Sequence, residues 1–181
     1  MKKKVRWITE TAAMLALLVA LQALTKPMGQ AVTGSCVNTV LAVAALFGGL
    51  SCGLTVAICS PVLAFALGIA PQILTVPAIM AGNCVYVLLL ALIADKKGSN
   101  SVRQMLAWIA ASVGKFAVLY AIVAWLICGV FAQGLLDAGI MKAPMLTALP
   151  ATFGWMQLAT ALSGGAIALV ITPVLKKALK K

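Results

Sequence analysis

The sequence predicts an all-α integral membrane protein, a bundle of about six transmembrane helices with both termini cytoplasmic, formed by a single domain over residues 1–181. Hydrophobic residues make up 64% of the chain and charged residues only 9%, whereas soluble domains carry about 25% charged residues. Apolar runs that approach the roughly 20 residues of a spanning helix recur along the chain. Basic residues gather in alternate connections between these runs. The chain therefore has room for its spans and little else.

The first helix is predicted at residues 7–25. Its basic start and apolar core resemble a secretory signal, but no small-x-small cleavage site follows, so we expect an uncleaved span. It ends at TKPMGQAVTGS, where lysine, proline and two glycines cannot continue a lipid-facing helix. The second and third helices are predicted at residues 36–48 and 52–69, joined by a tight turn at FGGLSCG. Both are short for a full span.

Three longer helices are predicted in the second half of the chain. Pro71 opens the fourth, at residues 71–94, which ends in the polar loop DKKGSNSVR. The fifth is predicted at residues 103–131 and the sixth at residues 150–175, with AQGLLDAGIMKAPMLTALP as a longer connection between them. Soluble linkers, low-complexity segments and a convincing internal repeat are missing, which favours a single membrane domain.

The positions of the basic residues predict the orientation, because cytoplasmic loops are enriched in lysine and arginine. With both termini inside, Lys26 and Lys142 fall in outside loops. The inside segments hold Lys2, Lys3, Lys4, Arg6, Lys96, Lys97, Arg103, Lys176, Lys177, Lys180 and Lys181. The net charge of +11 is thereby interpreted as a topology signal and a set of phospholipid contacts, and nucleic-acid binding is not expected.

The sequence contains few residues that could support acid–base catalysis, metal binding or proton transfer. The chain has no histidine, and its only carboxylate side chains are Glu10, Asp95 and Asp137, so general bases and hard metal ligands are nearly absent. No carboxylate falls inside a predicted span, which argues against a proton-driven pump. The cysteines form no CxxC and are expected to pack as free thiols; they are Cys36, Cys52, Cys59, Cys84 and Cys128. We expect no metal, no cofactor and no enzymatic activity.

Lys115, in the segment ASVGKFAVLY, is the most informative polar residue. At 1.5 Å per residue it lies about 18 Å from Arg103 along the fifth helix, near mid-membrane. A central lysine costs roughly 2.5–3.5 kcal/mol, so it needs a partner or a wet cavity. The neutral side chains available as partners are Asn83, Gln157, Tyr120 and Ser112. Lys115 either fixes helix packing, pairs with the carboxylate or phosphate of a substrate, or is a deprotonated buried amine.

Other polar residues concentrate in the outer half of the predicted bundle. Taken individually, each fits a capping or packing role better than a ligand contact, and Trp155 belongs either to an interfacial aromatic belt or to a pocket. Gln30, Thr33 and Asn38 lie around the first outside loop. Gln72 lies at the start of the fourth helix, and Thr152 and Gln157 lie in the sixth. Taken together, the predicted substrate-binding residues are Lys115, Asn83, Gln157, Gln72, Asn38, Gln30, Trp155 and Tyr120.

A stripe of small residues marks the first helix. Ala12, Ala16 and Ala20 recur at four-residue spacing, with Ala13 beside them, so another helix can approach closely along that face. The stripe serves either packing within the chain or docking against a partner helix.

With these features the whole chain resembles the substrate-binding S component of an energy-coupling factor (ECF) vitamin transporter. The similarity lies in about six apolar helices in a short chain, a basic N-terminus, the alanine stripe, a polar loop after the first helix, and no energising machinery. The alanine stripe is the family motif among these features. No GxxxxGK[ST] motif for ATP binding occurs in the sequence.

The resemblance implies a multi-pass protein of a prokaryotic plasma membrane that captures a vitamin or micronutrient from outside. The mid-membrane Lys115 adds the expectation that this compound is small and carboxylate-bearing. It implies partnership with a transmembrane coupling subunit, through Ala12, Ala13, Ala16 and Ala20, and with two cytoplasmic ATPases. It also implies a gating loop at residues 26–35 and toppling of the whole subunit in the membrane. Pantothenate is the first substrate to test. The alternatives are an autonomous facilitator or channel, a structural assembly protein, and an enzyme using Lys115 or a cysteine without a nearby base.

Overall fold

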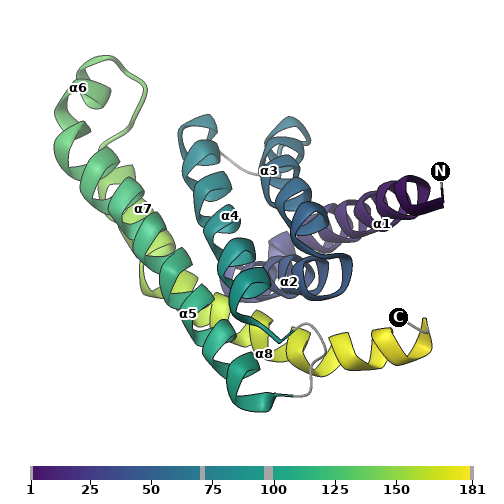
Figure 1. The fold of residues 1–181 in the computed structure, drawn as a ribbon. Helices are drawn as coiled ribbons and strands as arrows, with labels where there is room; N and C mark the ends of the chain where they lie inside the picture. Colours follow the sequence, from purple (N-terminus) through teal and green to yellow (C-terminus); the bar gives the residue numbers. More distant parts are fainter. Residues whose placement is uncertain (1, 70–71, 96–99, 180–181) are drawn as a thin grey trace.

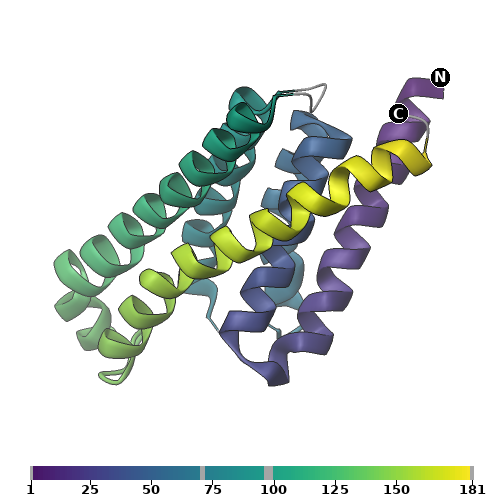
Figure 2. The same cartoon turned by 90° about the horizontal axis from the view of Figure 1, so that it is seen from below.

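The computed structural model of the chain describes residues 2–69, 72–95 and 100–179. Within these residues all regular structure is helical, which confirms the all-α membrane bundle. Five segments are long and apolar enough to cross a membrane, and one further apolar helix is shorter. Figures 1 and 2 both place the two ends of the chain on the same side of the bundle. Of the basic residues used to predict the orientation, Lys96, Lys97, Lys180 and Lys181 lie outside the described residues.

The second helix begins earlier than the sequence predicted. Helix α1 (Lys2–Thr25) is followed by the short 3-10 helix η1 (Lys26–Met28), and α2 (Gln30–Val43) then starts at once. Gly29 makes this possible with a φ of 90°, which glycine adopts without steric cost. The Thr33 hydroxyl donates to the backbone oxygens of Thr25 and Gly29. The expected polar loop is therefore mostly helix.

The next turn agrees better with the prediction. Helix α2 continues as the π-helical segment η2 (Ala44–Gly48), and Gly49, with a φ of 87°, reverses the chain into α3 (Leu50–Ala66). Helix α3 contains Pro61 and is the shorter apolar helix. It ends three residues before the predicted boundary at 69.

The fourth and fifth helices form the centre of the second half. A 3-10 turn, η3 (Ile73–Thr75), leads into α4 (Val76–Ile93), while the predicted start at Pro71 lies outside the described residues. Helix α5 (Ser101–Leu119) continues as the π-helical η4 (Tyr120–Val130). The Asn100 side chain caps α5 by accepting a hydrogen bond from the Arg103 amide, as an N-cap residue does.

The long connection predicted after the fifth helix is itself partly helical. It contains α6 (Ala132–Asp137) and α7 (Met145–Phe153), and the last helix is α8 (Trp155–Ala178). The break between α7 and α8 falls at Gly154, whose ψ of −127° is not helical. Pro150 was predicted to start the last helix but lies inside α7.

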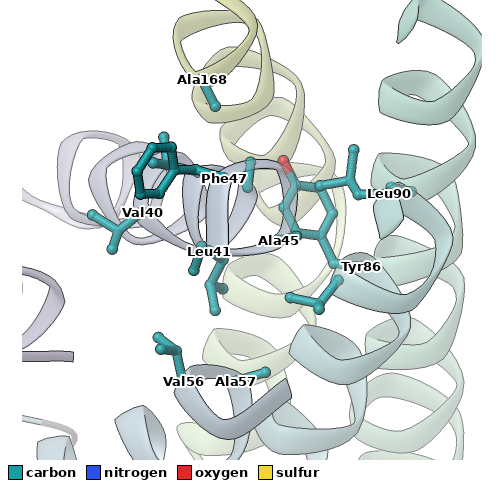
Figure 3. Close-up of a cluster of buried hydrophobic side chains, with 14 of the residues drawn as sticks. Val40, Leu41, Ala45, Phe47, Val56, Ala57, Tyr86, Leu90 and Ala168 are labelled. Atoms are coloured by element: carbon teal, nitrogen blue, oxygen red, sulfur yellow. The ribbon is translucent and has the colours of Figure 1, made fainter. Parts of the chain in front are cut away.

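Two buried apolar clusters hold the helices together. The first joins α1, α2, α3, α4, α5 and α8, and Figure 3 shows Leu41, Val56, Tyr86 and Ala168 converging in it from four of these helices. The second joins α4, α5, η4 and α7, and includes Leu119 and Phe153. The Tyr86 hydroxyl, fully buried, donates to the Ala161 carbonyl at 3.2 Å, which satisfies its polar end.

Helices α2 and α8 cross very closely, and this crossing fixes the floor of the site described below. A Cβ atom added at Gly164 would lie 2.5 Å from the backbone oxygen of Ser35, so glycine is required there. The Ser35 and Ser163 hydroxyls hydrogen-bond at 2.7 Å. Small residues and hydroxyl pairs of this kind are typical of helix contacts in membranes.

Candidate ligand-binding site

A cavity of about 360 Å³ is lined by Leu119, Leu149 and Phe153 of the second apolar cluster and by Val37, which packs against the first. Helices α1, α2, α4, α5, α7 and α8 and the segment before α4 all contribute to its wall. Its volume falls at the lower end of the range for small-molecule sites. From Gln30 to Asn38 along α2 it is about 12 Å deep, at 1.5 Å per residue. The wall has three levels, which we name the floor, the belt and the mouth.

The floor consists of four buried polar residues: Asn38, Asn83, Lys115 and Gln157. Lys115 Nζ donates to Asn38 Oδ1 at 2.6 Å and to Asn83 Oδ1 at 2.7 Å. It also lies 5.6 Å from the centre of the Tyr86 ring, within reach of a cation–π attraction. Only 3% of the lysine is exposed. The ammonium is thus surrounded by neutral groups, and none of the carboxylates in the described residues lines the cavity.

Asn38 lies deeper than the sequence suggested. It was placed among the polar residues of the first outside loop, but the early start of α2 puts it more than two turns inside that helix. Its Nδ2 donates to Thr160 Oγ1 at 3.3 Å, and Thr160 in turn donates to the Gln157 backbone oxygen at 3.2 Å. Hydrogen bonds therefore connect α2, α4, α5 and α8 across the floor.

The belt is a ring of apolar side chains above the floor. One turn along each helix from the floor residues, the lining changes to Ile79 on α4 and Leu119 on α5. The remaining belt residues come from α2 and α7: Val37, Leu149 and Phe153. A ligand that reaches the floor must present an apolar section at this level.

The mouth is polar and, apart from the buried Thr75, more exposed than the floor. Gln22, Lys26, Gln30 and Gln72 line it, with threonine hydroxyls at 33, 75 and 152. Lys26 Nζ donates to the Gly68 backbone oxygen at 2.9 Å, which connects the chain after α1 to the end of α3. Gln22 was not predicted to line the site, although an isolated amide in the apolar run of the first helix is an identifiable signal. Lys26 had been interpreted as a topology residue.

Two predicted contacts lie outside this cavity. Trp155 is 76% exposed and Tyr120 is 50% exposed, and neither lines the wall. Both pack against Phe116, with ring centres 5.3 Å and 5.8 Å from it. They form an aromatic surface cluster, as expected of an interfacial belt. Ser112, considered as a partner of Lys115, instead donates to the Trp108 backbone oxygen at 2.9 Å.

The alanine stripe faces outward. All four of its residues, Ala12, Ala13, Ala16 and Ala20, are exposed, whereas α1 packs on the bundle through its opposite side, including Thr11 and Leu18. The stripe therefore takes no part in packing within the described chain. It remains available to another helix.

No group of three metal-ligating side chains forms a metal site in the described part of the chain. All five cysteines are described, and none forms a disulfide.

Comparison with known families places the chain as follows. The family described as "ECF transporter, substrate-specific component" matches residues 10–176, a range that contains the stripe and every residue lining the cavity. No curated protein and no solved structure matches the chain.

Proposed function

The chain belongs to the family of ECF transporter substrate-specific components, and from this premise we propose that its cavity binds a small, carboxylate-bearing vitamin or micronutrient. As a member of this family it is a multi-pass protein of the cell membrane. It works with a transmembrane coupling subunit and ATPase subunits, and its own role is to bind the substrate. The residues proposed to bind that substrate are Lys115, Asn83, Asn38, Gln157, Gln72 and Gln30.

The observation that carries the proposal is that the buried ammonium of Lys115 has no carboxylate partner among the described residues. Lys115 is 3% exposed and has only amide oxygens within hydrogen-bond distance. A buried charge without an opposite charge is expensive, because the attraction that would offset its lost hydration is missing. A ligand carboxylate in the adjoining cavity supplies that attraction and an additional charge-assisted hydrogen bond.

The three levels of the wall define what else the ligand contains. An apolar section suits the belt, and hydroxyl or amide groups suit the glutamines and threonines of the mouth. Pantothenate is the first compound to test, because it joins a carboxylate to an amide, a dimethyl-substituted carbon and two hydroxyls. Its two ends would lie at Lys115 and near Gln30.

Native mass spectrometry of the detergent-purified protein tests this proposal directly. We expect wild-type protein to retain a small anionic molecule and Lys115→Met to lose it. Lys142→Met is the matched control, because Lys142 is exposed and lies outside the cavity. Retention of a neutral molecule, or equal retention by Lys115→Met, would contradict the proposal.

Transport requires more than the cavity. We assign contact with the coupling subunit to the exposed stripe on α1, since small side chains allow close helix approach. The segment 26–35, which includes η1 and the start of α2, is proposed as the gate because it carries mouth residues. Both termini are assigned to the cytoplasm from the distribution of basic residues.

An autonomous channel has less support. Beyond the floor, α2 and α4 continue with the buried apolar residues Leu41, Tyr86 and Leu90, rather than with a polar stripe toward the other side. A subunit that holds its substrate and depends on a partner for movement fits this arrangement better.

A further inference from the structure

The hydrogen bonds of Lys115 determine the orientation of two amide side chains. An ammonium has three N–H donors and no acceptor, so any amide that contacts it must present its oxygen. Asn38 and Asn83 do this from opposite helices, at 2.6 Å and 2.7 Å. Both side chains are 1% exposed and have no room to turn freely. Their NH₂ groups must therefore point away from the lysine.

These NH₂ groups have different partners. That of Asn38 donates to Thr160 Oγ1, whereas that of Asn83 makes no hydrogen bond with the described residues. The third N–H of Lys115 is likewise unused by the described protein atoms. Since Asn83 and Lys115 both line the cavity, unused donors of two buried side chains adjoin the same space.

Gln157 adds a third unpartnered group. It is 6% exposed, it lines the cavity, and its side-chain amide makes no hydrogen bond within the described residues. A ligand that reaches the floor can therefore add a hydrogen bond with this amide. The floor thus offers an amide to a ligand in addition to the ammonium.

We propose that the floor is an anion seat in which Lys115 and the NH₂ group of Asn83 together receive a carboxylate, making Asn83 the residue that selects carboxylates over amides and alcohols. This inference rests on the proposed function, because it concerns the same cavity. A carboxylate has only acceptors and forms stronger, charge-assisted bonds with both donors. An amide or alcohol of the same shape lacks the charge and brings donors that have no acceptor between Lys115 and Asn83.

The choice of asparagine over aspartate at position 83 follows from the same geometry. Aspartate has nearly the same shape, but its carboxylate would pair with Lys115 permanently and leave the charge of the seat neutralised. Asparagine satisfies one lysine N–H, orients its own NH₂ group and leaves the positive charge available. The residue therefore keeps the empty site receptive to an anion.

The test uses short carboxylates and their neutral analogues as probes of the purified protein. Thermal unfolding in detergent is measured with butyrate or valerate, and with butyramide or valeramide, at equal ionic strength. A probe that binds only the folded state raises the melting temperature. We expect the carboxylates to raise it by about 2 °C or more at saturating concentration and the amides to leave it within error. Equal shifts for valerate and valeramide, or no shift with either carboxylate, would overturn the anion seat.

Variants then assign the selectivity to the floor. Asn83→Asp should abolish the response to valerate and raise the melting temperature of the empty protein, because Lys115 gains a permanent partner. Asn38→Asp neutralises the same lysine from α2 and should also abolish the response, which covers the case in which one variant fails to fold. Asn100→Asp is the matched control at the start of α5, outside the cavity, and should respond like wild type. An undiminished response in a folded Asn83→Asp protein would refute the assignment.

The two proposals fail in different ways. If valerate stabilises the protein but the retained natural molecule is neutral, the anion seat stands and the carboxylate-bearing vitamin is wrong. If the retained molecule is anionic but valerate and valeramide are equivalent, the proposed function stands and the seat is wrong.

Discussion

Two lysines line the same cavity in opposite environments, Lys115 in the floor and Lys26 in the mouth. The first is 3% exposed and bound by two asparagine oxygens, and the second is exposed and bound to the Gly68 backbone oxygen. Water hydrates and screens a charge at the surface, whereas a buried charge interacts at low effective dielectric. From this difference we expect Lys115 to influence the charge of the bound ligand strongly and Lys26 to influence it weakly.

The largest expected effect is that of Lys115→Met. It should weaken binding of an anionic ligand, tested first with pantothenate, by roughly 2–5 kcal/mol, the scale for truncating one member of a buried charge pair. Folding should be preserved or improved, because an uncompensated buried charge is removed. Calorimetry measures the affinity, and thermal unfolding measures the stability. Unchanged affinity with a lower melting temperature would reduce Lys115 to a packing residue.

Lys115→Arg keeps the charge and should still weaken binding, by at least about 1.4 kcal/mol, or tenfold. The planar guanidinium is longer and cannot occupy the space between two asparagines that fit a compact ammonium. Comparison with the Met variant by calorimetry separates geometry from charge. Wild-type affinity in the Arg variant would mean that the floor recognises charge alone.

Lys26→Met should have a smaller effect, below about 1 kcal/mol, because the lysine is exposed and screened. That effect should disappear between about 0.1 M and 1 M salt, whereas the loss caused by Lys115→Met should persist. Titrations of both variants at the two salt concentrations make the comparison. A salt-resistant loss larger than about 1 kcal/mol in Lys26→Met would show that the mouth closes over the ligand and excludes water.

Ala16→Trp should not change ligand affinity, since the stripe lies on the outer face of α1, away from both lysines. It should nevertheless abolish uptake, because a tryptophan prevents close approach of a partner helix. Calorimetry and uptake by cells expressing the coupling module give the two readouts. Equal co-purification of the coupling subunit with wild type and Ala16→Trp would contradict the docking assignment.

Helical periodicity explains which floor residues could be predicted. Lys115 and Asn83 are polar residues in the middle of long apolar runs. The free-energy cost of burying an unpaired polar group in the membrane therefore predicted that both face the interior and that they interact. Leu119, one turn after Lys115, shares its face. Tyr120 points about 140° away from Lys115 at 100° per residue, a relation that was available from the sequence and argues against the predicted contact.

The errors concern the breaks between helices. The polar, glycine-containing segment after α1 suggested a loop, but hydroxyls that bond to their own backbone and the positive φ of Gly29 let α2 begin at Gln30. This six-residue difference explains why Asn38 was placed near the surface. Pro150 similarly suggested a helix start, whereas the break fell at Gly154. Glycine, proline and polar residues indicate that a helix is interrupted nearby, but tertiary packing determines the residue at which the interruption occurs.

The abrupt start of α2 at Gly29 has a consequence for how this segment tolerates insertions and deletions. Nothing lies within 4 Å of a Cβ atom added at Gly29, so the surroundings do not restrict side-chain size there, although the positive φ favours glycine. Chain length is different, because the Thr33 hydroxyl of α2 donates to the Thr25 backbone oxygen across this connection. A shift of α2 by one residue in its packed position would turn its side chains by about 100°. Asn38 would then leave Lys115. Across descendants of this sequence, the spacing from Thr25 to Gln30 should be better preserved than the residues that fill it.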